Sequence, residues 1–210
     1  MGDYFKYPRT PHLPWSPGAT SDDVFLVDTS LFDNKQVVVT EKMDGENTTL
    51  YADYMHARSV NSRYHPSRDW VKGFHGTIAH LIPKDWRVCG ENLYAIHSIE
   101  YDNLPSYFLA FGIFDEKNIC LSWEDFIEKC EELKLATPKV FYKGIWDQAK
   151  IKAISFDRDS VEGYVVRIAD SFHFHDFAKS VAKCVREGHV QTQTHWMHQQ
   201  VRPNKLKGGQ

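Results

Sequence analysis

Lys42 ends an apolar stretch and directly precedes a turn. It lies in the segment 41–47 (EKMDGEN), after the β-branched run 36–40 (QVVVT). Asp44 and Gly45 favour a tight turn, so Lys42 would stand at a strand end that holds its amine rigidly. Such an amine can serve as a nucleophile. The pattern Lys-x-Asp-Gly alone also fits an ordinary solvated hairpin, since it should arise by chance in roughly a few per cent of chains of this length.

The segments around this lysine predict a framework of strands with few helices. Residues 36–40 and 47–52 are expected to form two antiparallel strands around the turn. Further strands are expected at 87–93, 107–114, 161–168 and 180–185. Helical spacing of apolar residues predicts a helix over 70–81, and Ser122 can cap a second helix that ends before Pro138. This order, without regular alternation, indicates an α+β fold with mainly antiparallel sheets.

The proline-rich stretch 8–17 should form an extended arm on the surface, because proline fixes its backbone and lacks an amide donor. Trp15 within it is expected to cover the core. The four cysteines stand far apart without a Cys-x-x-Cys pair, which predicts reduced core residues and argues against a zinc ribbon.

Composition narrows the class of protein. At 210 residues, with 42% hydrophobic residues, the chain can form one large globular domain. The absence of a membrane-length apolar run and of a signal peptide predicts a cytoplasmic protein without membrane contact. A net charge of -3 means that nucleic-acid binding must come from local patches. Two basic groups are present: Arg58, Arg63, Arg68 and Lys72; and Lys179, Lys183, Arg186, Arg202, Lys205 and Lys207.

Further short segments follow Lys42 in a fixed order. They are ARS at 57–59, CGEN at 89–92, the hydrophobic run YFLAFGIFD at 107–115, EGYVVRI at 162–168 and AKCVR at 182–186. With Lys-x-Asp-Gly, they resemble the motifs of the covalent nucleotidyltransferase superfamily, which contains RNA ligases, DNA ligases and capping guanylyltransferases. The resemblance spans 36–186 and favours the ATP-dependent RNA ligase branch, where an asparagine follows the attachment lysine by five positions, as Asn47 does here.

The resemblance implies a role for each matching residue. Lys42 would carry AMP covalently, Lys183 and Arg58 would stabilise the transition state, and Glu162 would hold a metal ion or its waters. ATP is the implied cofactor together with Mg²⁺, for which Mn²⁺ could substitute. The implied nucleotide contacts are Glu41 to the adenine amino group, Glu91 to a ribose hydroxyl, Phe111 stacked on adenine, and Lys42, Asn47, Arg58, Lys183 and Arg186.

The implied reaction has three phosphoryl transfers. AMP moves from ATP to Lys42 and then to a 5′-phosphate end, and a 3′-hydroxyl finally expels it. An ordinary lysine has a pKa of about 10.4 and is almost fully protonated at neutral pH. We therefore expect burial, Lys183 and bound magnesium to lower the pKa of Lys42. The implied partners are RNA ends, including a nicked duplex, and an end-processing kinase or phosphatase.

One motif departs from the family pattern. The last motif of the family usually carries Lys-x-Lys, whereas here Lys183 is followed by Cys184, Val185 and Arg186. Arg186 and Lys179 are both candidates for the second cation, although on a regular strand Arg186 would face away from Lys183. Arg63 similarly competes with Arg58 for the nucleotide role, and the spacing of ARS favours Arg58.

The resemblance also implies the architecture. We expect residues 1–210 to form a single nucleotidyltransferase (ATP-grasp-like ligase adenylation) domain of packed antiparallel sheets with flanking helices. No C-terminal oligonucleotide-binding barrel is expected, so end alignment would come from this surface or from a partner. Two alternatives remain: a capping-type guanylyltransferase that attaches GMP to Lys42, and a non-catalytic module that binds nucleotide or nucleic acid.

Polar segments outside the motifs admit two interpretations each. HFHD at 173–176 has metal-ligand residue types, but its alternation also fits a strand with one polar face, which we favour. His189, His195 and His198 could contact phosphates or simply be solvated. The basic tail 202–209 could follow a nucleic-acid backbone or be disordered.

Overall fold

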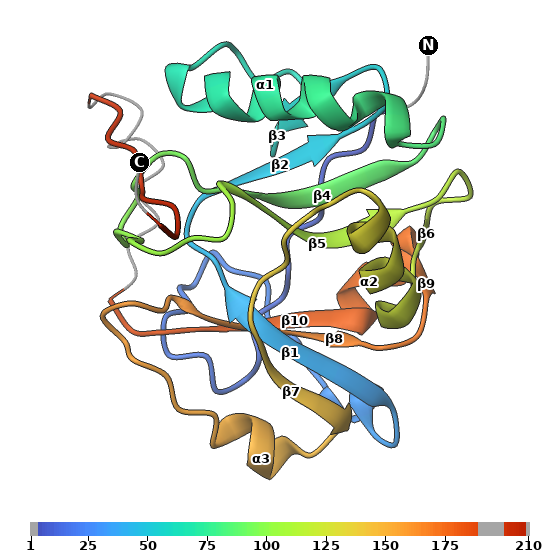
Figure 1. The fold of residues 1–210 in the computed structure, drawn as a ribbon. Coiled ribbons are helices and arrows are strands. Elements are labelled where there is room, and N and C mark those ends of the chain that lie inside the picture. Colours follow the sequence, from blue (N-terminus) through green and yellow to red (C-terminus); the bar gives the residue numbers. More distant parts are fainter. Residues whose placement is uncertain (1–3, 189–199, 209–210) are drawn as a thin grey trace.

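Two antiparallel sheets form the centre of the fold. The computed structural model describes residues 4–188 and 200–208, and Figure 1 shows one sheet above the other. The four-stranded sheet has the order β10 (Val181–Val185), β8 (Gly163–Ile168), β1 (Gln36–Lys42) and β7 (Val140–Ile145). The six-stranded sheet has the order β3 (Met55–Ala57), β2 (Glu46–Leu50), β4 (Arg87–Asn92), β5 (Phe108–Phe114), β6 (Ile119–Cys120) and β9 (Phe172–His173). The expected α+β fold of packed antiparallel sheets is confirmed.

Helices flank the sheets. Helix α1 (Asp69–Ile78) lies over the six-stranded sheet and shares a buried apolar cluster with α2 (Trp123–Glu132). The remaining helices are short: η1 (Thr29–Phe32), η2 (Pro66–Arg68), η3 (Ala79–Leu81), α3 (Gln148–Lys152), η4 (Phe174–Asp176) and α4 (Phe177–Ser180). Both predicted helices are confirmed. The Ser122 hydroxyl accepts from the Asp125 amide at 3.2 Å, which caps α2 as expected.

The predicted hairpin of residues 36–40 and 47–52 is wrong. Strand β1 pairs with β7 and β8, whereas β2 pairs with β3 and β4 in the other sheet. Because both edges of β1 are occupied, β2 cannot pair with it. The turn at Asp44 and Gly45 therefore carries the chain from one sheet to the other, and Lys42 stands at this crossing.

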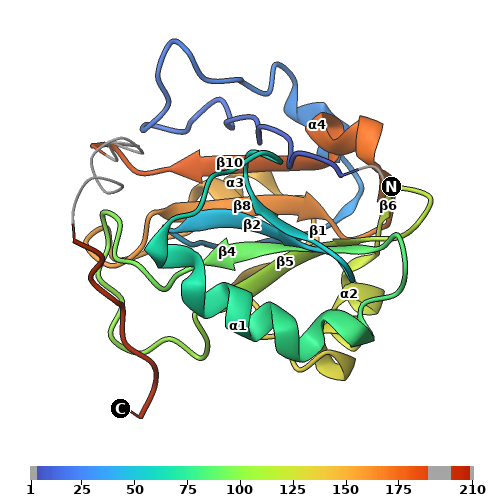
Figure 2. The ribbon, with the colours of Figure 1, turned by 90° about the horizontal axis from the view of Figure 1, so that it is seen from above.

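The N-terminal arm (residues 8–18) lies only partly on the surface, with Pro14 and Pro17 exposed and turns at 14–15 and 17–18. The Leu13 amide donates to the Lys183 carbonyl at 2.7 Å, and the Lys183 amide donates to the Pro11 carbonyl at 2.9 Å. Leu13 is fully buried, and Figure 2 shows the arm running beside β10. The prediction of a surface arm is wrong for the buried part of the arm, because its backbone donors and acceptors pair with the open edge of β10. Trp15 packs near Trp146 in the core, as expected.

All four cysteines are buried free thiols, as predicted. Among residues 4–188 and 200–208, no helix is long and apolar enough to cross a membrane.

Candidate active site

A cavity of about 750 Å³ opens between the two sheets at the crossing. Strands β1, β2, β4, β5, β8 and β10 all contribute residues to it. The structure therefore brings together residues that lie more than a hundred positions apart in the sequence. The predicted site residues in its lining are Glu41, Lys42, Asn47, Arg58, Glu91, Phe111, Glu162 and Lys183.

Lys42 forms an ion pair with a buried carboxylate. Its Nζ donates to Glu162 Oε2 at 2.6 Å, and Glu162 is 1% exposed. The strand register explains the contact, because Lys42 pairs with Gly163, the residue after Glu162. Gly163 has a φ of +156°, and a Cβ there would lie 2.0 Å from the Cys184 carbonyl oxygen. Only glycine allows β8 to approach β10 so closely.

The ion pair sets the protonation of Lys42. Burial would lower the pKa of the Lys42 ammonium, but the charges of Glu162 and Glu91 outweigh it and raise the pKa. The expectation of a lowered pKa is thus wrong for the chain by itself. Lys183 behaves in the opposite way: burial and the charge of Lys42 lower its pKa to about 8.

Two further acidic groups line the cavity. Burial raises the pKa of Glu91 to about 8 against the opposing charge of Lys42, and Glu91 Oε1 accepts from the Gly45 amide at 3.2 Å. Burial also raises the pKa of Glu41. Near neutral pH a substantial share of Glu91 is therefore protonated and can donate a hydrogen bond.

Phe111 is directed into the cavity by a β-bulge. In the pairing of β4 with β5, Cys89 faces Gly112 and Gly90 faces Ala110, so Phe111 is the extra residue of β5. Its ring packs edge-on against Tyr7 at 5.1 Å between centroids. The bulge presents an aromatic ring to the cavity, where a planar ligand could stack on it.

Asn47 lies across from Glu91 in the pairing of β2 with β4. Its Oδ1 is buried and has no hydrogen-bond partner among the described residues. Buried polar atoms in folded proteins nearly always have a partner. The amide is thus suited to a ligand that enters the cavity with a donor.

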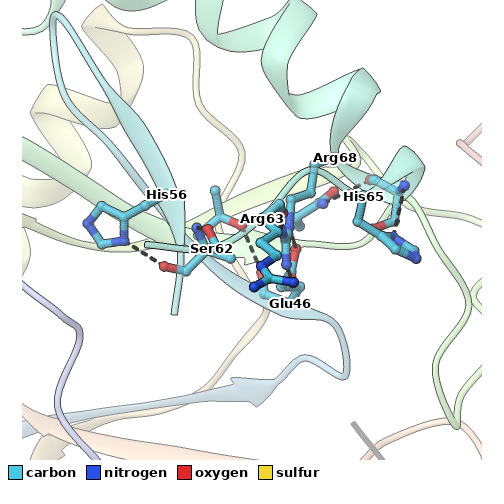
Figure 3. A network of polar contacts seen from close by, with 10 residues as sticks. Glu46, His56, Ser62, Arg63, His65 and Arg68 are labelled. Carbon is cyan, nitrogen blue, oxygen red and sulfur yellow. Dashed lines mark hydrogen bonds and ion pairs between the residues drawn. The ribbon is translucent and has the colours of Figure 1, made fainter. Parts of the chain in front are cut away.

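The loop that carries Arg58 is connected through Arg68 to Glu46, the first residue of β2. Arg68, which is 8% exposed, donates through Nε to Glu46 Oε2 at 2.7 Å and forms a second, bidentate contact with the same carboxylate (Figure 3). Arg68 also donates to the Arg63 carbonyl. Arg58 and Arg63 both line the cavity, so the geometry does not separate these two candidates. The sequence placed Arg68 only in a basic group and did not foresee its partner Glu46.

Asp44 of the Lys-x-Asp-Gly motif organises the β4–β5 loop (residues 93–107). Its Oδ2 accepts from the amides of Ser98 at 2.7 Å and Ile99 at 2.8 Å, and from the Ser98 hydroxyl at 2.8 Å. Its own amide donates to the Tyr101 hydroxyl at 2.9 Å. His97 and Ser98 of this loop line the cavity and were not predicted. No sequence pattern pointed to them, since the loop has no regular periodicity.

The two candidates for a second cation lie outside the cavity lining. The Arg186 amide donates to the Glu162 carbonyl at 2.9 Å, but its side chain is not among the lining residues. Lys179 is 67% exposed and pairs with Asp176 at 3.3 Å. The cations that do line the cavity are Lys6, Arg9, Lys42, Arg58, Arg63, Arg68, Arg167 and Lys183.

Among residues 4–188 and 200–208, no group of three His, Cys, Asp or Glu side chains could hold a metal ion by itself. The strand expected at HFHD ends at His173 and is followed by the 3₁₀ turn η4. His189, His195 and His198 lie outside the described residues. Glu162 remains the candidate metal contact, and an ion there would need oxygens from a bound substrate.

Comparison with solved structures identifies the fold. A Naegleria gruberi RNA ligase with PPi has a TM-score of 0.58 at 15% identity, with 88% of this chain and 58% of that chain covered. A mutant of that ligase with ATP and Mn has a TM-score of 0.53 at 16% identity, with 73% and 50% covered. The chain therefore has the nucleotidyltransferase fold of ATP-dependent ligases. It spans little more than half the length of these relatives.

The family follows from the sequence itself. An RNA ligase family model matches residues 35–185, and the chain belongs to this family. No curated protein matches the chain.

Proposed function

We propose that this chain is an ATP-dependent RNA ligase whose Lys42 carries AMP and that residues 1–210 form one adenylyltransferase domain. The observation that carries the proposal is the contact of the Lys42 amine with buried Glu162 at 2.6 Å, inside a cavity that also holds Phe111. Lys42 lies at a strand end beside a carboxylate and a second lysine. The charges of these neighbours control whether its amine is neutral and can act as a nucleophile.

The cavity fits a nucleotide in size and chemistry. Its volume of about 750 Å³ lies within the ordinary range for small-molecule sites. Phe111 offers a face for adenine, and Asn47 Oδ1, which has no hydrogen-bond partner within residues 4–188 and 200–208, offers an acceptor. Glu41 would recognise the adenine amino group and Glu91 a ribose hydroxyl.

Glu162 would contact Mg²⁺ or Mn²⁺ together with phosphate oxygens, since Mg²⁺ commonly binds to one or two carboxylates plus a substrate phosphate. When bound, the ion would neutralise charge on the phosphates. With the Glu162 carboxylate engaged away from Lys42, the main contact that raises the pKa of Lys42 is lost. Burial would then lower that pKa and leave more of the amine neutral.

The first step forms a bond between Lys42 Nζ and the α-phosphorus and breaks the bond to pyrophosphate, with loss of an amine proton. AMP then moves to the 5′-phosphate of an RNA end, and attack by a 3′-hydroxyl expels AMP. Lys183 and Arg58 would stabilise the negative charge that develops on phosphate oxygens. RNA ends that lack the 5′-phosphate or the 3′-hydroxyl would first have to be converted by a kinase or a phosphatase.

The RNA end would enter beside the loop that carries Arg58 and Arg63. Tyr64 in this loop lines the cavity and is 67% exposed. Its hydroxyl donates to Asp69 at 2.9 Å, and Lys72 Nζ lies 4.6 Å from the ring centroid. An exposed aromatic ring among cations is the combination with which proteins bind single-stranded RNA.

Incubation with radiolabelled ATP and Mg²⁺ tests the proposal. We expect covalent labelling of the wild-type chain, a mass increase of one AMP, and no labelling of Lys42→Ala. Labelling by GTP in preference to ATP would indicate a capping-type guanylyltransferase, and no labelling by either would indicate a non-catalytic module. Sealing of 5′-phosphorylated RNA and DNA ends, single-stranded and nicked, then identifies the substrate.

A further inference from the structure

The C-terminal segment (residues 200–208) is docked on the β4–β5 loop. The Asn204 amide donates to the Tyr94 carbonyl at 2.8 Å, and the Leu104 amide donates to the Lys205 carbonyl at 3.0 Å. The Lys207 amide in turn donates to the Leu104 carbonyl at 2.8 Å. Figure 1 shows this segment, in red, beside the green loop. The basic tail of the sequence is therefore ordered over these residues and held by its backbone.

Asn204 is the buried centre of this contact, with 2% of its surface exposed. Its Oδ1 accepts from the Tyr101 amide at 2.7 Å, and its Nδ2 donates to the Leu93 carbonyl at 2.8 Å. Its carbonyl accepts from the Tyr107 hydroxyl at 2.9 Å. Removal of this side chain would leave buried loop groups without partners, which is costly.

The loop residue that Asn204 holds also contacts the nucleophile motif. The Tyr101 amide bonds to Asn204, and the Tyr101 hydroxyl accepts from the amide of Asp44 at 2.9 Å. Asp44 lies two residues after Lys42 and, as described above, accepts three hydrogen bonds from Ser98 and Ile99. A continuous set of hydrogen bonds thus links Asn204 to the turn that follows Lys42.

We propose that the C-terminal segment is a latch and that Asn204 is a positioning residue for AMP attachment. The inference rests on the proposed function. Asn204 touches neither the cavity nor Lys42. It fixes Tyr101, which fixes the backbone of Asp44 and thereby the direction in which Lys42 enters the cavity. A small displacement of a reacting group can cost about 100-fold in rate.

The test compares Asn204→Ala with Arg202→Ala in the full-length chain. Arg202 belongs to the same segment but is exposed and pairs with Glu100 at the surface at 3.2 Å. We expect Asn204→Ala to lower the maximal rate of AMP attachment about 10- to 100-fold, with little change in the KM for ATP, and Arg202→Ala to match the wild type. Rates are measured well below each unfolding temperature.

A matched control separates positioning from loss of stability. Ile151→Ala removes a fully buried side chain of α3, which is not part of the hydrogen-bonded set, and should destabilise the fold without changing the rate at saturating ATP. Should Asn204→Ala fail to fold, Asn204→Asp serves instead, because it keeps the acceptor for Tyr101 and loses the Nδ2 donor to the carbonyls of Leu93 and Ala95. We expect an intermediate rate for it.

A double-mutant cycle tests the path through Tyr101. Tyr101→Phe removes the hydroxyl that Asp44 contacts, so its effect and that of Asn204→Ala should be less than additive. Wild-type kinetics in folded Asn204→Ala, or fully additive effects, would overturn the inference. If the wild-type chain attaches no AMP, the proposed function fails. The latch is then judged by hydrogen exchange at the Ser98 and Ile99 amides, where unchanged protection in Asn204→Ala would refute it.

Discussion

Replacement of Lys183 by alanine should remove two contributions to AMP attachment. Lys183 lines the cavity on β10 and is 9% exposed, so its charge acts with little screening by solvent. It would stabilise the phosphate oxygens in the transition state. Its positive charge also disfavours the ammonium form of Lys42, because nearby like charges repel. Burial and, second, the charge of Lys42 lower the pKa of Lys183 in turn.

The expected size follows from these two effects. Loss of one preorganised electrostatic contact costs about 100- to 1000-fold in rate, or about 2.7 to 4 kcal/mol. The pH dependence gives a second signature. Because the pKa of Lys183 is lowered to about 8 while that of Lys42 is raised, the wild-type rate should rise with pH as more Lys42 loses its proton and level off above about pH 8 as Lys183 loses its charge. In Lys183→Ala the rise should continue above pH 8.

Single-turnover labelling with radiolabelled ATP between pH 6 and 10 measures both signatures. Lys179→Ala is the matched control, since this exposed lysine lies outside the cavity lining and should leave the rate unchanged. Near-normal attachment by Lys183→Ala together with an inactive Lys179→Ala would show that the motif lies on the other lysine. A levelling-off above pH 8 that persists in Lys183→Ala would refute the titration argument.

Four further predictions concern the same cavity. Lys42→Ala should abolish AMP attachment but still seal a substrate that already carries 5′-adenylate, because only the first step uses the amine; a gel assay of both steps checks this. Glu162→Ala should lower activity in a way that excess Mg²⁺ or Mn²⁺ restores only in part, since the metal contact loses geometry as well as affinity, and a metal titration measures it. Arg186→Ala should lose little labelling activity, because its side chain does not line the cavity; a loss as severe as that of Lys183→Ala would make it the second cation after all. Tyr64→Ala should weaken binding of 5′-phosphorylated RNA, by about 1 to 3 kcal/mol for one stacked base, and leave AMP attachment unchanged; fluorescence anisotropy with Tyr64→Phe as the control tests this.

Much of the fold could be predicted because local pattern and burial agree. The expected strands at 36–40, 87–93, 107–114, 161–168 and 180–185 all form, with ends shifted by at most two residues. The hairpin failed because pairing depends on which neighbours occupy the edges of β1, and β7 and β8 are distant in the sequence. Strand β7 was missed altogether, since much of its surface is exposed and it lacks a clear apolar alternation.

The candidate site could likewise be predicted from the sequence only in part. Family resemblance placed Lys42, Glu162 and Lys183 in one site, and the structure brings them into one cavity. The bulge that directs Phe111 could not be foreseen, because it arises from the register of β5 against β4. The direction of the pKa shift of Lys42 was missed for a related reason: the balance between burial and the charge of Glu162 depends on a 2.6 Å contact that spacing does not give.

The pairing of the N-terminal arm with β10 has a consequence for self-association. An uncovered edge strand presents a row of free backbone donors and acceptors to other copies of the same chain. Here the arm bonds to β10 on one side, and on its other side the His12 amide donates to the Val24 carbonyl. The prolines at 8, 11, 14 and 17 lack amides, so the arm occupies the edge while offering few free amides to a further strand. We therefore expect the arm to prevent other copies of the chain from pairing with the edge of β10, the strand that carries Lys183. A preparation that lacks it would lose solubility as well as the backbone contacts that hold this lysine in place.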